Sequence, residues 1–519
     1  MNMKKYFSIV AAIIVVSICG CNDFLDVTPD NRTEIRDDNL AQLLTSGYAN
    51  RNAIVMTEMM SDNTDHYPDA GVSAFAILQD QMWEWADIKE EGNESPKSLW
   101  EQWYKAIAVS NAALDYIKSQ GNPKHLDPQR GEALLIRALH HFLLVNVFCK
   151  HYSATTGATD LGIPYMEAPE TTVLPQYERG TVAEVYEKIN KDIEMGLPLI
   201  DDNLYTQPKF HFNQKAAYAF ATRFNLYYRK YDKVIEYANA VLGTNPATIL
   251  RDMPFFLTLE QNPLPIGLEY VKPSQNANLL LMTLISQAGS IFTNYSTGKK
   301  YMHATNLSVQ ETYRSNGPWG NWTSTMYWLW SGSYGTGYTV VAKIPYMFEY
   351  TDRVAGIGYQ HTVIPMFQSD ETLLCRAEAY ILKQDYTNAL KDMNLWVSRH
   401  TRAGAELTLE NINDFYNARD YYTPQFPTVK KRLNPEFAIA NDGNQENMLH
   451  CILQIRRIET IHEGLRWYDV KRYGIVIYRR TYDRNNTLFV SDELTVNDPR
   501  RAIQLPANVI VAGMTPNPR

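Results

Sequence analysis

The chain has 519 residues and carries 57 acidic against 49 basic side chains, which gives a formal net charge of −8. This balance argues against a nucleic-acid-binding protein, because binding to phosphates depends on clustered Lys and Arg side chains. The length alone would suggest roughly three domains, although a helical scaffold with insertions can fold as one unit.

The N-terminus has the pattern of an exported lipoprotein. Lys4 and Lys5 precede an apolar run from Tyr6 to about Ile18, which is shorter than the ~20 residues of a membrane-spanning helix and typical of a signal peptide. The run ends in Ile18-Cys19-Gly20-Cys21, which resembles a bacterial lipobox. We therefore predict a signal peptide over residues 1–20 and a lipid on Cys21 that anchors the mature protein in a membrane. The alternative is an ordinary signal peptide with incidental cysteines.

Three cysteines remain in the mature chain, namely Cys149, Cys375 and Cys451. They are far apart in the sequence, stand in apolar contexts and show no metal-binding spacing. We expect buried free thiols. The alternative, in an oxidising compartment, is a disulfide between two of these cysteines.

Helical periodicity dominates about half of the chain. Leu99, Trp103 and Ile107 recur at spacings of four, as on one face of a helix. Two later segments each predict a small-residue helix, a turn and a second helix, and superposing Tyr231 on Tyr386 aligns Val234 with Ala389. Both segments are similar to tetratricopeptide repeats. The fold class is therefore predicted to be mostly α, a tetratricopeptide-like scaffold with helical repeats at about 97–150, 181–242, 368–402 and 454–474.

Two long segments interrupt this scaffold, at about 62–93 and 243–365. Segments of this length without regular helices are uncommon in compact domains unless they carry function. The second contains the stretch Asn316 to Tyr338, in which seven aromatic residues and five glycines fall within 23 positions. Glycines loosen the backbone and suit loops more than a packed strand. We expect the insertions to be irregular and to carry function.

The segment Arg456 to Gly474 combines an apolar face with alternating charges. Ile458, Ile461 and Leu465 predict one helix face, and Gly474 would end the helix. Opposite charges three residues apart predict ion pairs within this helix, and these are Arg456 with Glu459, Glu463 with Arg466, and Asp469 with Arg472. Such pairing disfavours a role for Glu463 and Asp469 as catalytic acid and base.

Motifs for catalysis or cofactors are absent from the sequence, including the metalloprotease, P-loop and serine-hydrolase patterns. Asp62, Asn63 and Asp65 could hold calcium, but they lack the glycine and terminal Glu of a dedicated loop. We predict no catalytic residue, no metal and no cofactor, and hence a protein that is not an enzyme.

Several stretches together resemble the SusD/RagB family of cell-surface lipoproteins that take up nutrients in Bacteroidota. They are Cys21 to Val27 with Pro29, Trp100 to Asn111, Leu373 to Gly404, Arg456 to Gly474 and the closing residues 504–519. The resemblance implies one SusD-like domain over 21–519 at the cell surface of the outer membrane. It also implies a SusC-like TonB-dependent transporter as partner and a ligand site built by the insertions.

The layout of the family places the ligand site in the loop after the first helices and in the long insertion. By this resemblance the expected ligand residues are Asp65, Tyr67, Trp83, Trp85, Tyr295, Trp319, Trp322 and Trp330. Aromatic rings suit the apolar face of a sugar, so a glycan is the first candidate. An oligopeptide, as in the RagB branch, is the alternative, and a surface glycoside hydrolase or a purely structural repeat protein is less favoured.

Overall fold

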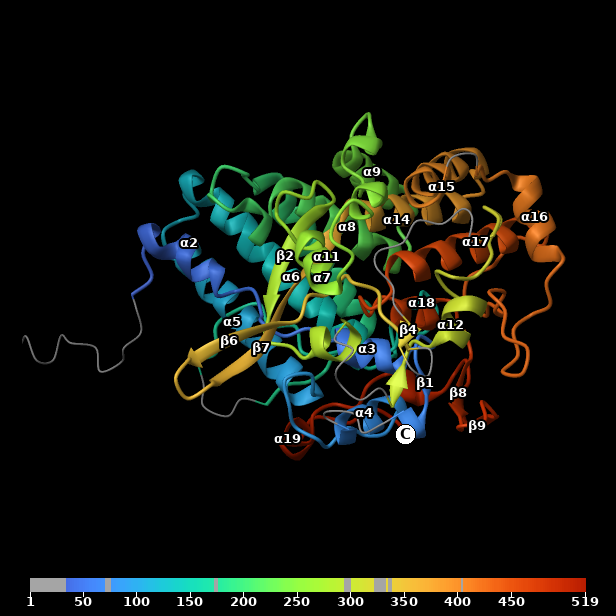
Figure 1. Cartoon of the computed structure of the whole chain (residues 1–519). Coiled ribbons are helices and arrows are strands. Elements are labelled where there is room, and N and C mark those ends of the chain that lie inside the picture. Colours follow the sequence, from blue (N-terminus) through green and yellow to red (C-terminus); the bar gives the residue numbers. More distant parts are fainter. Residues whose placement is uncertain are drawn as a thin grey trace, which may run out of the picture.

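Helices supply most of the regular structure in the computed structural model (Figure 1). It describes residues 34–70, 76–171, 176–293, 300–321, 333–334, 338–402 and 405–519. The predicted signal peptide over residues 1–20 lies outside these ranges, as do the predicted sites Cys21, Tyr295, Trp322 and Trp330.

The N-terminal half of the scaffold is built around two long antiparallel helices. α5 (Pro96–Ser119) begins where the Ser95 side chain accepts a hydrogen bond from the Ser98 amide and Pro96 occupies the first turn. α6 (Asp127–Phe148) packs between α5 and α7 (Val182–Gly196). Although α6 is long and apolar enough to span a membrane, its apolar part is entirely buried by the protein. It is therefore the central core helix of this half.

Two further helix pairs form the predicted repeat. The first is α8 (Gln214–Tyr227) with α9 (Tyr231–Leu242), and the second is α14 (Ser369–Leu382) with α15 (Tyr386–His400). Arg229 and Gln384, two residues before the superposed tyrosines, both adopt positive φ angles, of 62° and 61°. The two turns thus share an unusual backbone conformation. α14 packs against α9 and α17 (Asn444–Glu459), which confirms a mostly helical, stacked scaffold.

The insertion contains more regular structure than the sequence predicts. β2 (Asn278–Leu284) and β6 (Met347–Asp352) both pair antiparallel with β7 (Ile357–Gln368), giving a three-stranded sheet in the order β2-β7-β6. The expectation of an irregular insertion is wrong for these residues, because a run of leucines in β2 is buried against β7 and the helices. The β6–β7 hairpin projects from the body (Figure 1).

A second sheet joins the two insertions to the C-terminal hairpin. Its order is β3-β1-β8-β9, with the bounds β3 Tyr301–Met302, β1 Asp65–His66, β8 Ile477–Tyr482 and β9 Leu488–Leu494. The remaining elements are α2 Asp37–Thr45, α3 Ile54–Met60, α4 Ala76–Trp83, α10 Met253–Phe256, α11 Pro263–Tyr270, α12 Thr305–Gln310, β4 Ser333–Tyr334, β5 Tyr338–Thr339, α16 Leu409–Asn417 and α19 Ala507–Val511.

The C-terminal motif forms two helices, whereas the sequence predicts one. α17 (Asn444–Glu459) ends before a turn in which His462 and Gly464 have φ angles of 65° and 74°, and α18 (Arg466–Arg472) follows. Of the three predicted pairs, Asp469–Arg472 forms, at 2.7 Å, whereas Arg456 and Glu459 have other partners although both lie in α17. The other charged residues pair with distant parts of the chain, as for Arg466 with Asp62 at 2.8 Å.

Cys149, Cys375 and Cys451 are free and buried, so the prediction of buried thiols is confirmed.

The turn between α17 and α18 provides a stability test. A Cβ on Gly464 would lie 2.3 Å from Thr57 Oγ1, whereas a Cβ on Gly443, at the same φ of 74°, would meet nothing within 4 Å. Both Ala variants lose about 1–2 kcal/mol for the left-handed conformation. We expect Gly464→Ala to lower the free energy of unfolding clearly more than Gly443→Ala, as measured by urea denaturation. Equal losses would contradict the close approach to Thr57.

Candidate functional site

Four of the predicted ligand residues lie together beside the four-stranded sheet. Asp65 belongs to β1 and Tyr67 follows it, while Trp83 ends α4 and Trp85 comes two residues later. In Figure 1, α4, β1 and β8 lie close together on one side of the molecule. Both insertions therefore contribute here, because β1 pairs with β3 of the second insertion.

A stack of three rings forms the centre of this cluster. The Trp83 and Tyr301 ring centroids are 5.2 Å apart at 27°, and His66 lies 4.9 Å from Tyr301 at 28°. The Tyr301 hydroxyl donates to Asp80 Oδ1 over 2.7 Å, and the Lys300 ammonium pairs with the same oxygen at 2.8 Å. The Lys300–Asp80 ion pair therefore lies at the edge of the stack and is partly exposed, with about a third of the Asp80 side chain accessible to solvent.

Burial and the nearby Lys300 lower the pKa of His66 to about 4, so its ring is neutral at pH 7. Burial and the hydrogen bond to Asp80 raise the pKa of Tyr301. Trp83 and Tyr301 of the stack are buried, so the partly exposed Asp80 and Lys300 at its edge are the groups that a polar ligand can reach.

Trp85 holds the bend that follows α4. It is a non-glycine residue at a φ of 52°, and its indole nitrogen donates to the Met60 carbonyl over 2.8 Å. The Arg479 guanidinium lies 3.7 Å from the Trp85 ring centroid and donates to the carbonyls of Met59, Met60 and Ser61. This cation–π contact is largely desolvated and therefore stabilising.

The acidic residues near β1 are engaged by cations of the chain. Arg480 binds both carboxylate oxygens of Asp65 at 2.9 Å. Asp62 pairs with Arg466 at 2.8 Å and with Lys431 at 2.7 Å. Burial alone would raise the pKa of Asp62, but Arg457, Arg466 and Lys431 together hold it well below its usual value. These carboxylates are already neutralised, which disfavours calcium binding by Asp62, Asn63 and Asp65.

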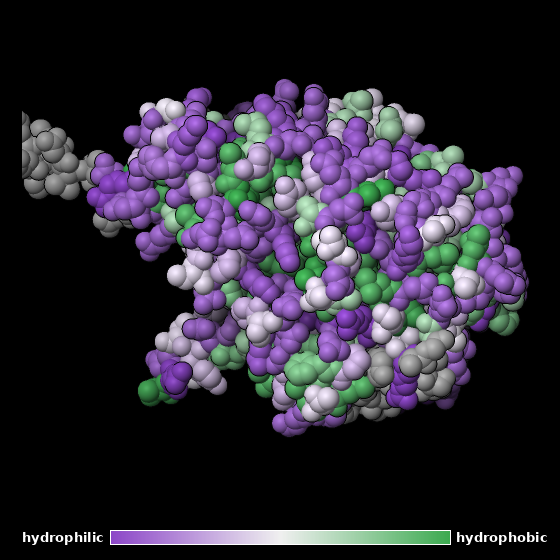
Figure 2. Space-filling model, turned by 90° about the horizontal axis from the view of Figure 1, so that it is seen from above, coloured by the Kyte–Doolittle hydropathy of each residue, from purple (hydrophilic) through white to green (hydrophobic). Residues whose placement is uncertain are grey.

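The described ligand candidates are packed in the interior. Asp65, Tyr67, Trp83, Trp85 and Trp319 each expose at most 7% of their surface. Trp319 lies apart from the other four, edge-on to Trp396 of α15 with ring centroids 6.2 Å apart. These five residues do not form the exposed aromatic surface that the sequence suggests. On the face shown in Figure 2, apolar residues are scattered among hydrophilic ones. Contact of the five residues with a ligand stays a prediction, as it does for Tyr295, Trp322 and Trp330.

An aromatic groove that the sequence analysis missed lies along α5. It has a volume of about 250 Å³ and is lined by Trp100, Tyr104, Ile107, Tyr177 and a segment from Pro164 to Glu170. The Tyr104 hydroxyl donates to the Pro164 carbonyl over 2.8 Å, which fixes this segment against the helix. Trp100, Tyr104 and Ala108 follow one another at spacings of four. This second face of α5 is the signal that could have revealed the groove.

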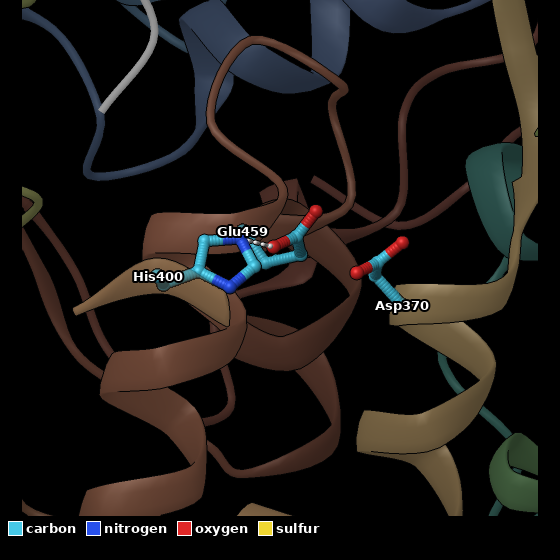
Figure 3. A group of neighbouring side chains, drawn as sticks. All are labelled: Asp370, His400 and Glu459. Atoms are coloured by element: carbon cyan, nitrogen blue, oxygen red, sulfur yellow. Dashed lines mark ion pairs between the residues drawn. The ribbon is translucent and has the colours of Figure 1, made fainter. Parts of the chain in front are cut away.

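A buried trio of possible metal ligands, Asp370, His400 and Glu459, is shown in Figure 3. His400 Nε2 lies 3.0 Å from Glu459, and His400 Nδ1 lies 3.0 Å from the Trp396 carbonyl. Each ring nitrogen of His400 therefore already has a partner within the protein. Burial and the nearby Glu459 raise the pKa of Asp370 to about 6. We interpret the trio as a buried polar cluster of the scaffold, since both ring nitrogens of His400 are already engaged.

Burial of the tryptophans yields a direct test. We expect Trp83→Ala and Trp319→Ala each to lower the free energy of unfolding by about 3–5 kcal/mol, because a large ring leaves a cavity in a packed interior. Phe426→Ala is the matched control, since Phe426 exposes 78% of its surface, and it should change stability little. Guanidinium denaturation measures all three. Unchanged stability of the Trp83 or Trp319 variant would show that the ring is not part of the core.

Comparison with known proteins identifies the family. A model described as starch-binding and associating with the outer membrane matches residues 23–226, and the SusD family model matches residues 285–506. No curated protein matches the sequence.

Solved structures share the fold over nearly the whole chain. A SusD superfamily protein from Bacteroides thetaiotaomicron is 18% identical with a TM-score of 0.63, covering 93% of this chain and 98% of that one. A SusD-like carbohydrate binding protein from Bacteroides vulgatus is 15% identical with a TM-score of 0.59, covering 92% and 96%. A laminarin binding SusD-like protein is 15% identical with a TM-score of 0.54, covering 93% and 98%.

At these identities the structural likeness establishes the fold, while the family rests on the sequence models. The two models match 204 and 222 residues, or 426 of the 519 together. The chain belongs to the SusD family.

Proposed function

We propose that the protein is an outer-membrane lipoprotein that binds oligosaccharides at the cell surface and delivers them to a SusC-like TonB-dependent transporter. The observation that carries this proposal is the match to two SusD models, one of them described as starch-binding and associating with the outer membrane. Two similar structures are described as binding carbohydrate or laminarin. The protein would act by binding its ligand, without chemical conversion.

The ring stack beside the four-stranded sheet supports this proposal. Tyr295 precedes Lys300 by five positions, and Lys300 joins the stack through Asp80. We propose that Tyr295, Trp322 and Trp330 provide the stacking contacts with sugar rings, while Asp80 and Lys300 offer hydrogen bonds to hydroxyl groups. Stacking of flat ligands on aromatic side chains contributes ~1–3 kcal/mol per ring, so a few rings along one glycan give useful affinity.

Binding to an oligosaccharide is tested by calorimetry on the soluble protein, residues 22–519, with purified polysaccharide fragments and with a mixed oligopeptide digest. We expect saturable heat with one class of glycan. Trp330→Ala and Tyr295→Ala should each weaken it by roughly tenfold, as loss of one stacking contact implies, and Phe426→Ala should leave it unchanged. Heat with the oligopeptides alone would replace the glycan proposal by an oligopeptide-uptake function of the same family.

The lipid anchor is tested separately. Cys21→Ala removes the sulfur that would carry the lipid, and two or more acyl chains are needed for stable anchoring. We expect the variant to be released from the membrane fraction, whereas Cys149→Ala, which alters a buried thiol, should stay there. Immunoblots of fractionated cells measure the distribution. A Cys21→Ala protein that still sediments with membranes would contradict the anchor.

A further inference from the structure

A polar pocket of about 390 Å³ lies on the scaffold, beyond the end of α6. Four parts of the chain line it, namely the segment after α6, the loop before α17, the end of α18 and the segment after β9. Its charged or titratable groups are Lys150, His151, Asp160, Glu436, Lys471, Asp498 and Arg501, and its neutral polar groups are Ser153, Thr155, Thr156, Asn434 and Asn497. The pocket is therefore rich in hydrogen-bond donors and contains charges of both signs.

The three carboxylates of this pocket are already engaged. Asp160 pairs with Lys150 at 2.7 Å. Glu436 lies 3.3 Å from Arg229 and accepts from the Thr155 amide and hydroxyl at 3.1 and 2.9 Å. Asp498 binds Arg500 at 2.8 Å. Each of the three carboxylates therefore pairs with a cation other than Lys471 or Arg501.

Lys471 and Arg501 are the two buried cations of the pocket, with 2% and 5% of their surface exposed. Lys471 donates to the carbonyls of Asn146 and Cys149 at 2.8 and 2.6 Å. Arg501 donates to carbonyls alone, including those of Val470 and Ile475 at 3.1 and 2.6 Å. Within the ranges that the structure describes, neither cation forms an ion pair. A buried charge without a counter-ion is costly, and this pair faces a cavity that could hold one.

The titration of neighbouring groups agrees with an excess of positive charge. Burial is the main cause that lowers the pKa of Lys471 to about 7, and the nearby Arg501 lowers it further. Burial, Lys471 and Arg229 likewise lower the pKa of His151 to about 3. An anion placed between Lys471 and Arg501 would favour the charged ammonium and would draw a proton onto Lys471 at neutral pH.

We propose that this pocket is a second binding site that takes a small oxyanion, a carboxylate or a sulfate group, between Lys471 and Arg501. Ser153, Thr156 and Asn497 complete the polar lining. Its volume falls in the usual range for small-molecule sites, so the anionic group can be free or carried on a single sugar ring. The site is independent of the glycan site proposed above.

The test is calorimetry on the soluble protein, residues 22–519, with three probes: sodium sulfate, galacturonate and neutral galactose. Binding of sulfate shows that a free oxyanion is a sufficient ligand for this pocket. Binding of galacturonate without binding of sulfate shows that the ligand is a carboxylate carried on a sugar ring. Galactose should give no heat at this site. We expect binding of the anion to weaken with rising pH above 7, by up to tenfold per pH unit, because Lys471 must then take up a proton.

Lys471→Met should weaken anion binding by at least about tenfold at pH 6.5, since a charge-assisted hydrogen bond is lost, and should abolish the pH dependence. Asn497→Asp provides a variant on the exposed rim that adds a negative charge without disturbing the core, and it should weaken binding as well. Asn485→Asp, on the exposed turn between β8 and β9, is the matched control.

The proposal is overturned if neither anion gives saturable heat at millimolar concentration. It is also overturned if Asn497→Asp binds as tightly as Asn485→Asp, a comparison that holds even where Lys471→Met fails to fold. Binding of the polysaccharide fragments named under the proposed function should be unchanged in Asn497→Asp. Failure of the oxyanion site and failure of the glycan proposal are therefore distinguishable.

Discussion

The structure depends on pairing charges that the C-terminal motif brings into the core. Arg456 is fully buried and lies 3.1 Å from Asp469 and 3.4 Å from Glu378 of α14. Arg457 and Arg466 reach Asp62, close to the start of β1. Because an unpaired buried charge costs about 3–5 kcal/mol, these arginines fix the relative positions of the repeat helices, the N-terminal segment and the insertion. One helical motif thereby holds together parts of the chain that are about four hundred residues apart.

The same constraint explains how the side of the proposed glycan site is supported. Glu311, in the insertion, pairs with Arg457 and Arg480, and Arg480 also holds Asp65. The sheet between them carries the Trp83–Tyr301 stack with its outer edge formed by Asp80 and Lys300. A binding surface built on loops needs such a rigid base, since stacking contacts gain affinity only when the rings are held in place.

Local patterns in the sequence predict the scaffold well, because helical periodicity and repeat spacing are properties of neighbouring residues. The repeat spacing aligns Tyr231 with Tyr386, and the turns before these two residues share a positive φ. Features set by distant partners were not predictable in the same way. The bend at Gly464 depends on its close approach to Thr57, and the burial of Trp83 depends on β3. Aromatic composition alone does not distinguish a ring that binds ligand from one that supports the site.

Among the residues that the structure describes, buried cations differ in what stabilises them and in whether they line a cavity. Arg456 and its neighbours are paired with carboxylates. Arg251 and Arg479 are bound by carbonyl or amide oxygens, and aromatic rings cover them, with Tyr270 at 3.6 Å and Trp85 at 3.7 Å. Lys471 and Arg501 are likewise bound by carbonyls, but they line a polar cavity. Carbonyl dipoles offset part of the cost of burying a charge. It is therefore the open space beside these two cations, more than their burial, that points to an anionic ligand.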